Sequence, residues 1–157
     1  MSKTFVIAGT SYIFPEQGSE QPWGEQVTDW AEAVTDTLSG FSSTGDIGTT
    51  SVALDDNQPV ATNVNGFSFD GSLLQGAIAE YSIYRTNGAT GYSEVGHLYF
   101  SYNTQSGTWT FSQVGVGVGD TGITITISNT GQVKYTSTNL GGTHSCNITF
   151  RAHAFTN

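Results

Sequence analysis

The chain has 157 residues, enough for one domain or for one domain with an appended segment. Thirteen acidic and four basic residues give it a net charge of −9. Such a surface repels phosphate, so neither nucleic acid nor an anionic membrane is an expected partner. Its single cysteine excludes an internal disulfide.

The first part of the chain combines a short β segment with the one stretch that is clearly typical of a helix. The runs "KTFVIA" and "SYIF" predict a strand or short hairpin, which Pro15 ends. In the following segment the apolar residues recur with the 3.6-residue period of a helix, and acidic residues occupy the opposite face. The apolar stripe consists of Val27, Trp30, Ala31, Val34 and Leu38.

Two tryptophans in this region, Trp23 and Trp30, need a surface to cover them. A single helix with one short hairpin cannot bury two indoles by itself. The covering surface is either the C-terminal part of the same chain or another chain. We therefore expect residues 1–40 to form an attachment or oligomerisation segment, whose interface residues are Tyr12, Phe14, Trp23, Val27, Trp30, Val34 and Leu38.

Residues 41–65 are rich in Ser, Thr, Gly and Asp, and this composition predicts a linker or an extended arm that contains one strand, "TTSVAL". Within it, "LDDNQP" could offer oxygens to Ca²⁺, but the run lacks the EF-hand pattern and favours a turn. A domain boundary near residue 65 is expected. Nine of the thirteen acids fall within residues 16–56, so the chain beyond this region is nearly neutral.

From residue 66 to 157 the pattern changes to alternating segments separated by Asn-, Gly- and Asp-containing turns. Short links of this kind join antiparallel neighbours, so we predict an antiparallel β-sandwich, jelly-roll-like or Ig-like. Six strands are expected at 77–85, 94–103, 107–116, 122–128, 132–138 and 145–155, with "FSFDGSLL" as a seventh. In the last of the six, residues from Cys146 to Ala154 at alternate positions are expected in the core.

The residues give little support for catalysis or metal binding. His97, His144 and His153 show no zinc-binding spacing, and Cys146 lies on the apolar phase of its strand. In the β region only Asp70, Glu80, Glu94 and Asp120 could form the carboxylate pair of a glycosidase. "VGVGVGDTG" at 114–122 lacks the lysine of a phosphate-binding loop and predicts a hairpin or a strand edge. We expect no enzymatic activity, no cofactor and no metal.

The segment "SYIFPEQGSEQPWGEQVTDWAEAVTDTLSG" resembles the front end of small virion structural proteins of tailed bacteriophages, including cyanophages. In such proteins this segment precedes head-decoration (cement), head-fibre or tail-fibre modules. The residues that carry the resemblance are Tyr12, Pro15, Gly18, Trp23, Gly24, Val27 and Trp30. The second half of the chain is similar to the short β-rich domain that closes many phage proteins of this kind.

This resemblance implies a structural protein of the virion, made in the cytoplasm of a bacterial host. A homotrimer is expected, because a symmetric bundle of helices would cover the tryptophans. The first alternative is a capsid decoration protein that binds the major capsid protein or another virion protein. The second is a short tail-fibre or head-fibre protein that binds a host-surface glycan through Tyr84, Tyr92, Tyr99 and Tyr102. A polysaccharide hydrolase and an unrelated lectin-like domain are further alternatives, and no membrane insertion is expected.

Overall fold

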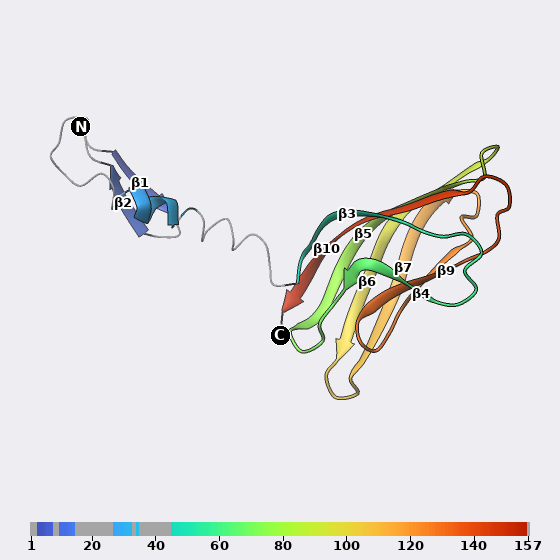
Figure 1. The fold of residues 1–157 in the computed structure, drawn as a ribbon. Helices are drawn as coiled ribbons and strands as arrows, with labels where there is room; N and C mark the ends of the chain where they lie inside the picture. Colours follow the sequence, from blue (N-terminus) through green and yellow to red (C-terminus); the bar gives the residue numbers. More distant parts are fainter. Residues whose placement is uncertain (1–2, 8–9, 15–26, 33, 35–44, 157) are drawn as a thin grey trace. The chain divides into compact units, whose positions relative to one another are not determined.

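The computed structural model describes residues 3–7, 10–14, 27–32, 34 and 45–156. The chain divides into two units, Met1–Ser43 and Thr44–Asn157, and each is described by itself (Figure 1). Among the described residues, no helix is long and apolar enough to cross a membrane.

The first unit contains a hairpin and a short helix, as the sequence predicts. Strands β1 (Lys3–Ile7) and β2 (Thr10–Phe14) pair antiparallel, with Phe5 opposite Tyr12. The helix is formed by residues 27–32 and 34.

The second unit is an antiparallel β-sandwich, which confirms the expected fold class. Its larger sheet has the strand order β3-β10-β5-β6-β7, and its smaller sheet has the order β4-β9-β8 (Figure 1). The strands are β3 (Ile47–Ala53), β4 (Thr62–Ser68), β5 (Leu74–Thr86), β6 (Gly91–Asn103), β7 (Thr108–Val118), β8 (Ile123–Ile127), β9 (Gln132–Ser137) and β10 (Ser145–Thr156).

The strand expected at "TTSVAL" within the region 41–65 is present as β3, which pairs with β10 at the edge of the large sheet, with Val52 opposite Ile148. The start of β4 at residue 62 pairs with β9 in the small sheet. The expected seventh strand, "FSFDGSLL", is the end of β4 followed by a turn, in which the amides of Leu73 and Leu74 donate to the Asp70 carbonyl.

The core lies between the two sheets, and alternation along the strands determines which side chains enter it. Its buried apolar residues come from Leu54 to Ala154, with Ile47 and Val52 packed against them. Phe67 of the small sheet stacks on Phe150 of the large sheet, with ring centroids 4.0 Å apart. The predicted core positions of β10 are buried, and burial raises the pKa of the Cys146 thiol to about 11.

Candidate functional site

Three regions are candidates for function: the helix of the first unit, the outer face of the large sheet, and a buried arginine at one end of the sandwich. In the helix, Val27, Trp30 and Val34 have the spacing that places side chains on one face. Val27 is 40% exposed, and Trp30 and Val34 are half-buried. The neighbouring acids Asp29 and Glu32 are exposed.

The remaining residues of the predicted interface are placed only in part. Tyr12 and Phe14 belong to β2, with Phe14 paired opposite Lys3. Trp23 and Leu38 lie outside the described residues.

The outer face of the five-stranded sheet, here called the open face, carries exposed side chains from at least four strands. They alternate with the core residues because successive side chains of a strand point to opposite sides. The open face comprises Ile78, Glu80, Ser82 and Tyr84 of β5, Val95, His97 and Tyr99 of β6, Val114, Val116 and Val118 of β7, and Thr149, Arg151, His153 and Phe155 of β10.

A polar row crosses the middle of the open face. Arg151 Nε and Nη2 each lie 2.6 Å from Glu80 Oε2, and His97 Nε2 lies 4.0 Å from Glu80 Oε1. All three side chains are about half exposed or more, so the pairs contribute little stability. Two open depressions of about 440 and 460 Å³ lie on either side of Glu80, which lines both. The polar row therefore offers accessible hydrogen-bonding groups and does little to stabilise the fold.

The four tyrosines predicted as a recognition surface do not share one face. Tyr84 and Tyr99 point out from the open face and are 54% and 44% exposed. Tyr92 lies opposite Arg85 on the core side of the sheet, and Tyr102 packs on Trp109 with ring centroids 5.0 Å apart. The alternation of β5 and β6 therefore places Tyr84 and Tyr99 on the open face and Tyr92 and Tyr102 on the core side.

The carboxylates considered for catalysis are held apart by the fold. Glu80 is on the open face, whereas Glu94 is on the core side, where Tyr81 Oη and Gln113 Nε2 donate to it. Asp70 accepts hydrogen bonds from the Ser72 hydroxyl and amide, which lower the pKa of Asp70. Asp120 accepts from the Gly122 amide in its own turn. Each acid therefore has a separate local partner.

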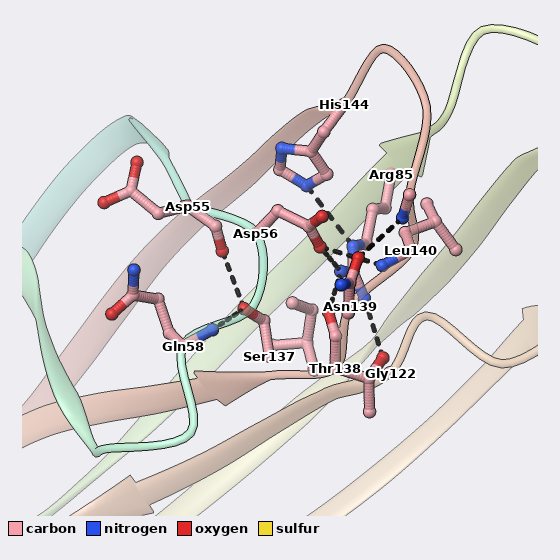
Figure 2. A network of polar contacts seen from close by, with 12 residues as sticks. Asp55, Asp56, Gln58, Arg85, Gly122, Ser137, Thr138, Asn139, Leu140 and His144 are labelled. Atoms are coloured by element: carbon pink, nitrogen blue, oxygen red, sulfur yellow. Dashed lines mark hydrogen bonds and ion pairs between the residues drawn. The ribbon is translucent and has the colours of Figure 1, made fainter.

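The third region is a network around Arg85, which sequence reasoning left unassigned (Figure 2). The Arg85 side chain is fully buried and forms an ion pair with Asp56. Its Nη1 donates to the Thr121 carbonyl at 2.5 Å, its Nη2 donates to the Thr138 carbonyl, and its Nε lies 3.3 Å from His144 Nε2. The alternation of "AIAEYSIYR" is the signal that places Arg85 on the core side.

The Arg85 network connects three loops that are distant in sequence. Asp56 comes from the loop after β3, Thr121 from the loop between β7 and β8, and His144 from the loop before β10. The Leu140 amide donates to Asp56 at 3.0 Å and lowers the pKa of that carboxyl, and the Arg85 hydrogen bond lowers it further. The arrangement gives the buried charge an acid and backbone carbonyls as partners, so removing one partner would leave a buried group uncompensated and destabilise the sandwich. "LDDNQP" supplies this acid.

No cluster of three or more metal-ligating side chains occurs in the part of the chain that the structure describes. Each histidine instead has a polar neighbour of its own: His97 is beside Glu80, His144 beside Arg85 and His153 beside Asp46. His153 Nδ1 lies 3.2 Å from an Asp46 oxygen, and the Ala154 amide donates to the same carboxylate at 2.6 Å.

No protein-family model matches the chain, and no curated protein matches it. Among solved structures, the chain is similar to the tailspike protein of Acinetobacter phage vB_ApiP_P1, with a TM-score of 0.42 and 16% sequence identity. The alignment covers 68% of this chain and 22% of the tailspike chain. The chain thus spans less than a quarter of the protein it matches, and a TM-score of this size does not establish a shared fold.

Proposed function

We propose that this chain is a non-enzymatic structural protein of a bacteriophage virion, most simply a decoration protein of the capsid. In this proposal the N-terminal unit attaches the protein to the shell and joins copies into a trimer. The sandwich is the displayed module. The resemblance of the segment around Tyr12, Trp23 and Trp30 to the front end of phage virion proteins supports this assignment.

The observation that carries the proposal is an accessible apolar stripe in a unit separate from the sandwich. Val27 is 40% exposed and Trp30 is half-buried within Met1–Ser43. The core of the sandwich is composed of residues from Ile47 to Ala154. Apolar surface of this kind is a common site of contact with another chain. A virion protein needs such a contact, because it must bind its neighbours.

The proposed absence of enzymatic activity is supported by how the acids are used. Asp56 pairs with Arg85, Glu80 pairs with Arg151, and Glu94 accepts from Tyr81. Glycoside hydrolysis needs two carboxyl groups facing one bond at a separation of about 5–10 Å. Glu80 and Glu94 are on opposite faces of the same sheet, so they cannot act as such a pair.

The open face favours a second candidate, a short fibre that binds a host-surface glycan. Sugars are bound by exposed aromatic rings next to planar hydrogen-bonding groups. Tyr99 is exposed, and the ring of His97 stacks near it with centroids 6.2 Å apart. Glu80 and Arg151 lie beside them in the polar row. In this candidate Tyr84 and Tyr99 provide the contacts, and Tyr92 and Tyr102 do not.

The test is the location and copy number of the chain on purified particles of the phage that encodes it. Decoration predicts copies in a fixed ratio to the major capsid protein, antibody labelling on the head, and particles that lose heat stability when the gene is deleted. A fibre predicts few copies and a loss of adsorption to host cells. Absence of the chain from purified particles would overturn both candidates.

A further inference from the structure

The second half of β7 is exposed apart from its pairing with β6 and the hydrogen bonds that the Gln113 side chain donates to Tyr81 and Glu94. Residues 112–118 all have exposed side chains or, for glycine, exposed backbone. On the open face Val114, Val116 and Val118 are 60%, 74% and 71% exposed. On the opposite face the strand presents Gln113 and two glycines. The strand also has a free edge among the described residues, because β7 ends the strand order of the large sheet.

Edges of sheets normally carry features that prevent pairing with another chain, such as charges, proline or bulges. Two of the other edge strands have irregular pairing: the β3 register shifts beside Phe150, and the β4 register shifts after Asn63. The remaining edge strand, β8, pairs regularly with β9 but has only 5 residues. By contrast, β7 pairs with β6 without a break from Thr108 to Val118. The sequence from residue 98 to 119 contains no acidic or basic side chain and no proline. The β7 edge is therefore long, regular and uncharged.

We infer that this edge binds the same edge of a second copy of the chain, in an antiparallel pairing centred on Val116. The argument for a second copy is the sequence "VGVGV" at 114–118, which is the same in both directions. Two such strands run antiparallel across a two-fold axis, which places Val116 opposite Val116. The same register places Val114 opposite Val118 and Gly115 opposite Gly117. Valine therefore meets valine on one face and glycine meets glycine on the other.

Charge supports this choice of surface. Each copy carries a net charge of −9, and nine of its thirteen acids fall within residues 16–56, so this region of one copy repels the same region of another. The β7 edge brings uncharged residues together, and Val95 of β6 lies beside Val116 and extends the apolar contact. Cross-strand pairs of β-branched residues stabilise antiparallel sheets. The pairing also satisfies backbone groups of the free edge.

The contact is small. Five paired residues span about 17 Å of strand, so the contact buries far less area than a standard interface of about 800 Å² per partner. Free copies therefore associate weakly and in a concentration-dependent way. Copies held close together, on one particle or through their N-terminal units, associate more strongly because their effective concentration is high. The inference itself does not depend on the proposed virion role.

Cysteine cross-linking of the full-length chain tests the register. Under mild oxidation, Val116→Cys should form a disulfide-linked dimer by itself. Val114→Cys and Val118→Cys should cross-link with each other when the two variants are mixed. Each variant alone should cross-link at least about tenfold less, because the same position in the two copies lies about 13 Å apart in this register. The native Cys146 is buried, and the wild-type chain is the control. Equal cross-linking of Val114→Cys alone and in the mixture would overturn the register.

A charge on the edge tests the contact itself. Val116→Lys should halve the mass of the assembly measured by light scattering at high protein concentration, whatever the state of the N-terminal unit. Val60→Lys is the matched control, because Val60 and Val116 are both 74% exposed. Circular dichroism verifies that both variants are folded. An unchanged mass for Val116→Lys would overturn the inference, whereas a failure of N-terminal trimer formation would change the mass by a factor of three.

Discussion

Replacing Arg85 with methionine tests whether the Arg85 network stabilises the sandwich. Arg85 makes five hydrogen bonds: one each to Asp56, the Thr121 carbonyl and His144, and two to Thr138, of which one goes to its carbonyl and one to its hydroxyl. At about 1 kcal/mol net for each bond, their loss costs about 5 kcal/mol. A buried methionine offsets roughly 2 kcal/mol of this through apolar contact. The expected net loss is about 3 kcal/mol.

For a unit of this size, a loss of about 3 kcal/mol corresponds to a fall in melting temperature of roughly 12 °C. Circular dichroism and urea unfolding measure it. The matched control is Arg151→Met, because Arg151 is 64% exposed and its pair with Glu80 is worth about 0.2–1 kcal/mol. If Arg85→Met unfolded at the same temperature as Arg151→Met, the stabilising role of the network would be refuted.

Further substitutions at three residues test single buried or paired groups. Because the pKa of Asp56 is lowered in the fold, its contribution to stability is present above about pH 4 and is lost as the pH falls below that value. The urea midpoint of Asp56→Asn should therefore change less between pH 5 and 2 than that of the wild type. Burial, with the hydrogen bond to Glu94, raises the pKa of Tyr81 to about 12, so the native fold should lose stability between pH 10 and 12. Tyr81→Phe should abolish that loss of stability. The phenolate titration of this variant, followed at 295 nm, should lack the tyrosine that titrates at the highest pH. Among the residues that the structure describes, the buried Trp109 Nε1 has no hydrogen-bond acceptor, so Trp109→Phe should cost under about 2 kcal/mol in urea unfolding, against about 3–5 kcal/mol for Trp109→Ala.

The sandwich and its core were predictable where strands alternate clearly. In β10, the positions from Cys146 to Ala154 expected in the core are buried, and Arg151, His153 and Phe155 on the other phase are exposed. The hairpin and the helix of the first unit were also predictable from their periodicity. In β10 each residue's phase therefore determines whether its side chain is buried or exposed.

The role of β3 was not predictable from composition. Its Ser, Thr and Gly residues are typical of a linker, and Val52 contributes to the core only because β10 pairs with it. Pairing between residues about 98 positions apart leaves no local signal. The same holds for the Arg85 network: alternation indicates that Arg85 points inward, but only the closed sandwich brings Asp56 to it.

The recognition surface shows a further limit of sequence reasoning. Tyr92, Tyr99 and Tyr102 lie on one strand, where Tyr99 is an odd number of positions from each of the other two and Tyr92 and Tyr102 are an even number apart. Two tyrosines on the same strand share a face only when their separation is even. The phase of β6 therefore decides which tyrosine is exposed, and the structure assigns Tyr99 to the open face.

The attachment role of the N-terminal helix is tested most directly by rebinding purified chain to particles assembled without it. The wild-type chain and Glu32→Gln, which changes the exposed acidic side, should saturate the particles at the same concentration. Val27→Gln should bind about tenfold more weakly, because burial of one valine contributes roughly 1.5 kcal/mol. If Val27→Gln bound as tightly as the wild type, or if the wild-type chain did not bind at all, the helix would not be the attachment surface.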